Sequence, residues 1–305
     1  MILIFFVYFL TFLTFVLSEQ KLDYTNQENY DIWTGMCNSK TSQSPIDLPD
    51  NDDCIQSTDY VQILSTNYPL INDKNVSFVH GYSFAIEFGD EGKQALTVKI
   101  NETTLVYDLK NIHFHFESEH KIEGELLPAE IHFVHDLHKD QQLRNIEEGE
   151  TGETDSNEHL VVGIFYDTND DSDDEYEDSF IKAIDFVNQN NISNLNFSSF
   201  ISNNKDFYYY HGSLTTPPCT ENVNWIIMKD KYEMSLEQFE QYKTYIETQY
   251  TGGNHRKTFP VNNRDIYFIN NDKDNTDSDA DSKSVQSSKY LIISYYLLLL
   301  IFFAV

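Results

Sequence analysis

Basic residues are scarce in this chain, and their scarcity excludes one class of function. Only 20 Lys and Arg residues stand against 50 Asp and Glu residues in a chain of 305, which gives a formal net charge of −30. A surface this acidic repels a phosphate backbone, so we expect no nucleic-acid partner.

Cysteine is scarce too, and residues 19–270 contain neither a Pro/Gly/Ser-rich linker nor an internal repeat. The chain is 40% hydrophobic and 14% aromatic, which is enough for a sizeable core and favours strands. We therefore predict one domain of about 250 residues. The three cysteines, Cys37, Cys54 and Cys219, allow one pair and one leftover thiol in an oxidising compartment, and their spacing alone does not choose the pair.

Long apolar runs are confined to residues 2–17 and 290–305. The first ends in Val16-Leu17-Ser18 and predicts a signal peptide over residues 1–18 rather than a longer membrane anchor. The second would span only about 24 Å as a helix, against a bilayer core of about 30 Å. Small residues at 278–280 and a polar spacer precede it, so residues 283–305 predict a GPI-attachment signal, with a short transmembrane helix as the alternative.

The remaining segments agree with the secretory route. Residues 271–282 form an acidic stalk without core-forming residues. Four glycosylation sequons are present: Asn75, Asn101, Asn191 and Asn196. We expect a protein on the extracellular face of the plasma membrane, tethered through its C-terminus, with plain secretion as the alternative. The oligomeric state stays open.

Short apolar stretches bounded by polar or Gly residues predict strands inside the domain. They are residues 84–88, 96–100, 112–116, 130–135, 160–166 and 222–228. Helical periodicity is convincing only at 179–189 and 235–248, each of which begins with a Ser at the helix N-cap. The fold class is therefore mainly β (α+β), with a few short peripheral helices.

Two acidic stretches, 147–155 and 170–178, predict solvated surface loops. Weak Ca²⁺ binding is the alternative for the second stretch. That alternative lacks the Gly and the terminal Glu that a calcium loop requires.

The main chemical signal is His113-Phe114-His115. Alternate side chains of a strand share a face, so the two histidines point one way and Phe114 points the other. A second strand carries His132, and an antiparallel neighbour would bring the three imidazoles together. Three protein ligands and one open position suit a catalytic zinc ion, although an isolated His-x-His is more often a pair of ordinary strand histidines.

An ordered set of motifs surrounds these histidines. They are Gln43-Ser44-Pro45-Ile46-Asp47, Ser118-Glu119-His120, Ala129-Glu130-Ile131-His132 and Gly212-Ser213-Leu214-Thr215-Thr216-Pro217-Pro218. In order and approximate spacing the set resembles the α-class carbonic anhydrases over residues 24–264. With the strand pattern, the resemblance leads us to expect a single domain on a large, central, twisted and mostly antiparallel sheet of about ten strands.

The resemblance implies reversible hydration of carbon dioxide to bicarbonate and a proton. By resemblance, His113, His115 and His132 bind Zn²⁺, which in this family lowers the pKa of its water to about 7 and supplies a zinc-bound hydroxide that attacks carbon dioxide. Thr215 matches the residue that accepts the hydrogen bond of the hydroxide. Glu119 matches the carboxylate that accepts the proton of Thr215.

The resemblance also assigns supporting residues. Glu130 corresponds to the carboxylate that holds His132, the Asn254 carbonyl to the partner of His115, and Asn111 to a family Gln beside His113. The shorter Asn111 side chain calls for a shifted strand or a bridging water. The expected substrate pocket consists of Val134, Val161, Leu214, Val223, Trp225 and Thr216, for which ordinary core packing is the alternative. Cys37 and Cys219 match the disulfide of secreted and membrane-anchored members, and Cys54 has no counterpart.

Two departures concern the mouth of the site and the packing behind it. Tyr82 stands where fast members carry a proton-shuttling histidine, and a phenol with a pKa near 10 is poorly matched to that task. We expect either a slower, buffer-dependent enzyme or a shuttle moved to His80. Phe116 replaces the usual Trp behind the zinc strand, which changes packing more than chemistry.

Three functions compete at this point. The first is carbon dioxide hydration. The second is a surface adhesion or recognition module that keeps the fold, and the third is a zinc hydrolase acting on activated esters. The intact histidines and the Thr215–Glu119 pair favour the first function.

Overall fold

The structure is a computed structural model, which describes residues 22, 24–25, 33–57, 59–71, 78–80, 84–140, 158–169, 195–196, 198, 200–202, 204–250 and 252–271. Several predicted segments lie outside these residues: the two apolar runs, the acidic stretches 147–155 and 170–178, the helix 179–189, and the stalk beyond residue 271. Among the described helices, none has the length and apolarity that crossing a bilayer requires.

Strands dominate the described part of the chain. They are β1 (Asp47–Leu48), β2 (Ile55–Gln56), β3 (Val61–Thr66), β4 (Leu70–Ile71), β5 (Phe78–His80), β6 (Phe84–Glu87), β7 (Leu96–Ile100), β8 (Thr103–Phe116), β9 (Lys121–Ile122), β10 (Glu125–Leu126), β11 (Ala129–Leu137), β12 (His159–Thr168), β13 (Leu195–Asn196), β14 (Phe207–Gly212), β15 (Val223–Met234) and β16 (Tyr267–Ile269). The helical elements that lie wholly within the described residues are η1 (Asn51–Asp53), η2 (Asp90–Gly92) and α4 (Leu236–Gln249). All six predicted stretches fall in strands, so the predicted fold class is confirmed.

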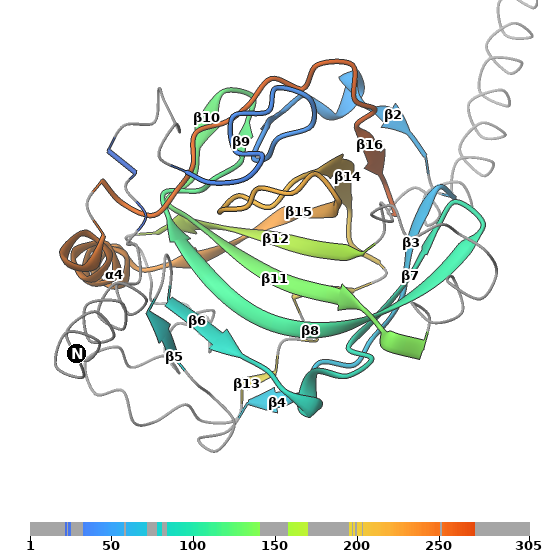
Figure 1. Cartoon of the computed structure of the whole chain (residues 1–305), viewed down its shortest axis with the longest axis horizontal. Coiled ribbons are helices and arrows are strands. Elements are labelled where there is room, and N and C mark those ends of the chain that lie inside the picture. The colour runs from blue at the N-terminus through green and yellow to red at the C-terminus, as the bar shows by residue number, and fades with distance from the viewer. Residues whose placement is uncertain are drawn as a thin grey trace, which may run out of the picture.

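Eleven of the described strands form one large curved sheet (Figure 1). Its order is β2-β16-β14-β15-β12-β11-β8-β6-β5, with β7 beside β8 and β3 beside β7. Most neighbours are antiparallel, whereas β12–β15 and β16–β2 are parallel pairs. Two smaller sheets, β1-β9-β10 and β13-β4, complete the described strands.

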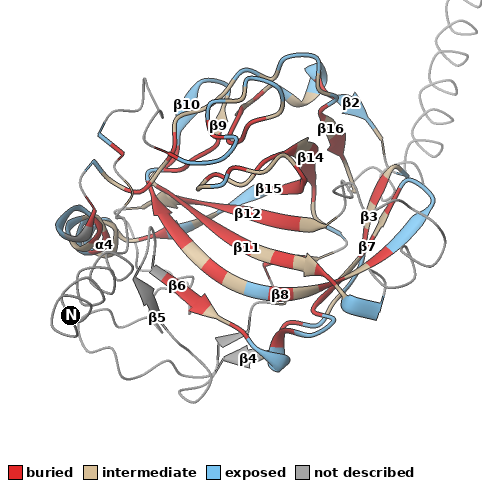
Figure 2. Ribbon diagram, viewed as in Figure 1, coloured by how far each residue is buried: buried red, intermediate tan, exposed pale blue. Residues whose placement is uncertain are grey.

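Burial alternates along the outer strands and is continuous in the middle of the sheet (Figure 2). In β7 every second residue is buried, as expected for a strand with one covered face. In β12 residues 160–166 are all buried, because both faces of this central strand are covered. One apolar cluster packs on the face that carries Ile112 and Phe114, and a second packs on the opposite face around Val161 and Trp225.

Helix α4 begins where the sequence places it. The Ser235 side chain accepts a hydrogen bond from the backbone N–H of Gln238, and the Gln238 side chain accepts one from the Ser235 backbone N–H. This capping box satisfies two N–H groups at the helix start. Its partner is Gln238, the third helical residue, rather than the nearby Glu237. The buried face of α4 rests on the end of β8, where Tyr242 stacks on Phe116 at 5.3 Å.

The disulfide joins Cys37 to Cys219, which confirms the predicted pairing, and Cys54 is a buried free thiol. Cys219 directly follows Pro218, whose carbonyl accepts the backbone N–H of Met36. A Cβ on Gly35 would lie only 2.3 Å from that carbonyl oxygen, so the close approach of the two segments requires glycine. The bridge therefore ties the segment near residue 36 to the loop that carries Thr215.

Candidate metal centre

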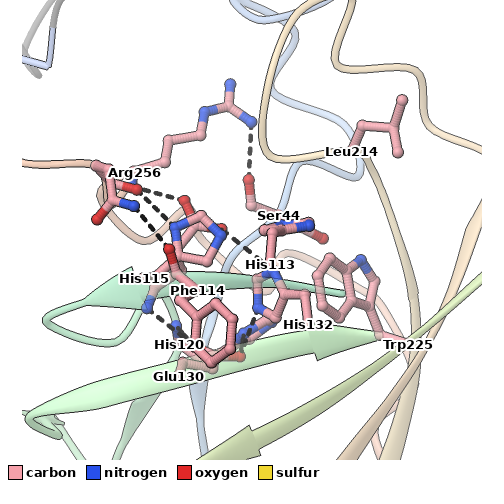
Figure 3. Close-up of polar contacts among 12 residues, drawn as sticks. Ser44, His113, Phe114, His115, His120, Glu130, His132, Leu214, Trp225 and Arg256 are labelled. Carbon is pink, nitrogen blue, oxygen red and sulfur yellow. Dashed lines mark hydrogen bonds and ion pairs between the residues drawn. The ribbon is translucent and has the colours of Figure 1, made fainter. Parts of the chain in front are cut away.

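The register of β8 and β11 brings the three histidines together. The two strands are antiparallel, and His132 lies directly opposite His113 while Glu130 lies opposite His115. Directly opposed residues share a face. The nitrogen atoms that the three rings offer lie within 4.8 Å of one another (Figure 3). The neighbouring Ile112 and Phe114 point into the apolar cluster of the other face, as the alternation predicts.

Each of the three rings is oriented by one polar partner. His113 Nδ1 bonds Asn111 Oδ1 at 2.8 Å, and His115 Nδ1 bonds the Asn254 carbonyl at 2.5 Å. His132 Nε2 bonds Glu130 Oε1 at 2.9 Å. Each ring donates through this nitrogen, which leaves the other nitrogen as the one able to bind a cation. Asn111 reaches His113 directly, so its short side chain needs no bridging water.

The donor set fits a metal ion. His115 Nε2 is fully buried and has no hydrogen-bond partner among the described residues, although buried polar atoms are nearly always paired. Burial lowers the pKa of His115 to about 4 and also lowers the pKa values of His113 and His132. Neutral imidazole is the form that binds metals. The three nitrogens thus satisfy the ligand type and number of an open zinc site.

Glu130 is the centre of a buried hydrogen-bond network. Its Oε2 accepts the backbone N–H groups of Glu119 and His120 at 2.9 and 2.8 Å, and its Oε1 accepts His120 Nδ1 at 2.7 Å. Burial raises the pKa of this carboxyl, but the two histidines outweigh burial and hold it well below its ordinary range. Glu130 is therefore an anion that fixes both the His132 ring and the loop after β8.

The network continues from His120 into the first motif of the chain. His120 Nε2 lies 2.6 Å from the Tyr210 hydroxyl, which lies 2.9 Å from Ser44 Oγ. Ser44 Oγ also accepts the backbone N–H of Ser213. The sequence identified the motifs that contain Ser44 and His120, but not this connection, and nothing marked Tyr210.

Glu119 and Thr215 lie beside the triad. Glu119 Oε2 is 3.5 Å from His115 Nε2 and 3.8 Å from His132 Nδ1, and Glu119 Oε1 accepts the backbone N–H of Arg256 at 2.8 Å. Burial raises the pKa of Glu119, and first His132 and then the Thr215 hydroxyl oppose that rise. Within the described residues, Oε2 nevertheless lacks a hydrogen bond of ordinary geometry. The predicted pair is thus adjacent, without a well-formed bond between its members.

Five of the six predicted pocket residues lie in or against one apolar cluster, called here the apolar wall. Val161, Val223 and Trp225 are buried in one apolar cluster. Val134 and Leu214 are partly buried and pack against it, and Thr216 is partly buried in the loop after Leu214. The Trp225 ring lies 4.9 Å from the His132 ring, so this wall adjoins the triad (Figure 3).

Some predicted site residues lie at the limit of the described chain or beyond it. Tyr82, Asn75 and Asn191 lie outside the described residues. Asn196 lies in β13, and Asn101 is exposed at the turn between β7 and β8.

His80 pairs with Phe84 on the neighbouring strand. His113 is instead paired with Ala85 on β6, which is paired with Val79 on β5. His80 is thus one residue away from Val79, the β5 position that aligns across the sheet with His113.

A family model described as eukaryotic-type carbonic anhydrase matches residues 25–270. Alpha carbonic anhydrase 2 of Arabidopsis thaliana is 30% identical over 70% of this chain and 82% of its own length. Mitochondrial carbonic anhydrase 5A of Rattus norvegicus is 27% identical over 79% of this chain and 78% of its own length. The match spans 54% of the length of the mitochondrial carbonic anhydrase 5B of Homo sapiens.

A solved structure of similar fold is the α-carbonic anhydrase of Thermovibrio ammonificans in complex with sulfanilamide. It superposes with a TM-score of 0.56 at 25% identity, over 76% of this chain and 89% of that one.

Proposed function

The chain belongs to the eukaryotic-type carbonic anhydrase family, and from this premise we propose that it hydrates carbon dioxide reversibly at a zinc ion held by His113, His115 and His132. Membership makes the chain a carbonic anhydrase enzyme whose reaction interconverts carbon dioxide and bicarbonate. The observation that supports the zinc ligands most directly is the buried His115 Nε2, which has no hydrogen bond from the described residues and lies beside two further imidazoles. A buried nitrogen of this kind carries an energetic cost that a bound cation relieves.

In carbonic anhydrases, a zinc ion lowers the pKa of coordinated water to about 7 and so supplies hydroxide at neutral pH. The residues of this chain position that chemistry. Asn111, the Asn254 carbonyl and Glu130 each fix one imidazole, so that the three remaining nitrogens face one point.

Thr215 and Glu119 orient the attacking oxygen in this proposal. Glu119 accepts a hydrogen bond from the Thr215 hydroxyl. The Thr215 oxygen is then free to accept a hydrogen bond from the attacking oxygen. The backbone N–H of Arg256 holds the other Glu119 oxygen and fixes the carboxylate in place. Because its own proton is hydrogen-bonded to Glu119, the Thr215 hydroxyl can only accept a hydrogen bond from the reactant. It therefore selects a reactant that carries a hydrogen-bond donor.

The apolar wall of Val134, Val161, Leu214, Val223 and Trp225 holds carbon dioxide. A small, uncharged substrate makes no strong polar contact, so exclusion of water by an apolar surface is the available means of binding it. Thr216 follows Thr215 in the chain and is partly buried.

We further propose that the protein is exported, glycosylated and tethered by a GPI anchor to the outer face of the plasma membrane. The Cys37–Cys219 bridge is consistent with an oxidising compartment. The exposed turn position of Asn101 is compatible with a glycan. Expression of the full chain in cells tests this: phospholipase cleavage of GPI anchors should release the protein, and glycosidase should lower its apparent mass. Retention after phospholipase treatment would identify a transmembrane anchor instead.

Stopped-flow measurement of carbon dioxide hydration tests the activity. We expect activity that a zinc chelator abolishes and added zinc restores, with one zinc ion per chain measured by atomic absorption. His132→Ala should lose both zinc and activity, whereas His138→Gln, a change at the partly buried histidine that directly follows β11, should keep both.

Two other outcomes would contradict the proposal. Zinc-dependent ester hydrolysis without carbon dioxide hydration would support the hydrolase alternative. A folded protein that binds no zinc would support the recognition module.

A further inference from the structure

A histidine–aspartate pair lies at the margin of the face that carries the triad. His159 is the first residue of β12, and its Nδ1 lies 2.8 Å from Asp136 Oδ1 on β11. Both side chains are partly exposed, His159 by 23% and Asp136 by 38%. The pair therefore has contact with solvent as well as a fixed internal geometry.

The register places this pair on the same face as the triad. Between β11 and β12, His132 is opposite Gly163, Val134 is opposite Val161, and Asp136 is opposite His159. Alternate residues of a strand share a face, so the three pairs form successive rungs on one surface. The rung of His159 includes Val223 on β15, so it lies at the end of the apolar wall, about 13 Å along the strand from the rung of His132.

The charges near His159 favour its protonated form. Asp136 bonds it directly, and the adjacent Glu158 adds negative charge. From β8, Asp108 lies opposite Asp136, and Lys110 Nζ lies 3.9 Å from Asp136 Oδ2. On the other flank β15 contributes the uncharged Val223. Burial lowers the pKa of His159, but Asp136 and Glu158 outweigh burial and raise it above its ordinary value.

Two buried histidines near the site are less suited to exchange protons with solvent. His120 is buried, and both of its nitrogens bond neighbours, Glu130 and Tyr210. His135 is buried with its nitrogens on the Tyr68 hydroxyl and the Leu160 carbonyl. Neither ring is exposed to bulk buffer.

We propose that His159 carries protons from the candidate site to bulk buffer. This inference rests on the proposed carbon dioxide hydration. Each turnover consumes one carbon dioxide and one water and yields one bicarbonate and one proton, which must leave before the next turnover.

The proton passes through water to Nε2 of His159, where an N–H bond forms as a water O–H bond breaks. Nδ1 keeps its own proton, which is hydrogen-bonded to Asp136, so the ring with both nitrogens protonated is an imidazolium. A buffer base then takes the Nε2 proton, which restores the neutral ring without any redox step. An imidazole can both take up and release a proton at physiological pH, so this side chain is suited to the transfer in both directions.

The test compares His159→Gln with the parent enzyme at low and high buffer concentration. At low buffer we expect kcat to fall by at least about tenfold, in the lower range of what one acid–base group contributes. We expect kcat/KM to stay within about twofold, because the proton leaves after carbon dioxide has reacted. High concentrations of imidazole buffer should restore kcat to the parent value. Zinc content and circular dichroism should match the parent.

Matched variants make the test decisive. His138→Gln removes a histidine that bonds Asp108 rather than Asp136, and it should leave kcat unchanged at every buffer concentration. Asp136→Asn keeps the shape of the pair but removes its charge, and should move the apparent pKa of kcat downward.

An unchanged kcat of His159→Gln at low buffer would overturn the inference. So would a loss that imidazole does not rescue, or an unshifted pH profile of Asp136→Asn. If the parent enzyme itself shows no hydration activity, the proposed function fails, and the variant comparison is not reached.

Discussion

Strand β8 carries apolar side chains on one face and the candidate metal-ligand histidines on the other, and the two faces are stabilised by different interactions. Ile112 and Phe114 are buried in the large apolar cluster, where contacts are non-directional. His113 and His115 each depend on one acceptor at a fixed distance. An apolar face tolerates substitutions that conserve volume, whereas a lost acceptor leaves a buried polar atom unpaired. We infer that the apolar face sets stability and the polar face sets the geometry of the site.

Loss of Glu130 should have the largest effect, because this carboxylate contributes to both stability and geometry. Glu130→Ala removes the acceptor of two backbone N–H groups and of two histidines. We expect the free energy of unfolding to fall by about 3 to 5 kcal/mol, as for other broken buried ionic networks. Urea denaturation of the chelated protein measures it. Glu130→Gln keeps the volume and one acceptor oxygen, so a loss as large as that of the Ala variant would contradict this assignment.

Ile112→Ala tests the apolar face in isolation. The side chain is fully buried, and its truncation should cost about 2 to 5 kcal/mol of unfolding free energy. The zinc dissociation constant should change by less than about twofold, a shift worth under half a kcal/mol. Competition with a fluorescent chelator measures that constant. Ile112→Val, which should cost about 0.5 to 1.5 kcal/mol, is the matched control. A tenfold weaker zinc affinity in Ile112→Ala would show that the two faces are coupled.

Asn111→Ala tests the polar face in isolation. Without its acceptor, His113 loses its preferred tautomer and orientation, and zinc should bind about tenfold more weakly. The side chain is only partly buried, so the unfolding free energy should change by less than about 1 kcal/mol. Asn111→Gln, which restores an amide at this position, should recover most of the affinity. If the Ala variant binds zinc as tightly as the parent, the orienting bond is not needed.

Local alternation predicted the two faces of β8 and the facing of His113 and His115, because the side-chain period of a strand depends on nothing else. The same pattern contains no information on strand partners. The parallel pairing of β12 with β15 therefore could not be predicted. Nor could the bonds of Glu130 to the backbone of Glu119 and His120, which depend on how a loop returns over the sheet.

Strand β14 was missed for a related reason. Its run of three tyrosines is buried on both faces, which no polar–apolar alternation marks. Gly163 shows a different limit. A Cβ at this position would lie 2.8 Å from Glu130 Oε1 and 2.7 Å from Ile227 Cδ1, so the requirement for glycine follows from neighbours that only the folded structure brings together.

The smallest expected effect concerns the margin of the polar face and depends on pH. The folded-state pKa of His159 is raised above its unfolded value, so protonated His159 stabilises the fold. This stabilisation is fully present below the unfolded pKa of about 6.5 and is lost as the pH rises through the folded pKa. His159→Gln should therefore destabilise the protein more at pH 5 than at pH 9, by less than about 1 kcal/mol because the pair is solvent-screened. Urea titrations of both proteins at each pH measure the difference, in which the other titrating groups cancel. A difference that is larger at pH 9 would mean that the fold favours the neutral His159 ring. Burial would then dominate the pKa of His159, as it dominates the pKa values of the triad histidines.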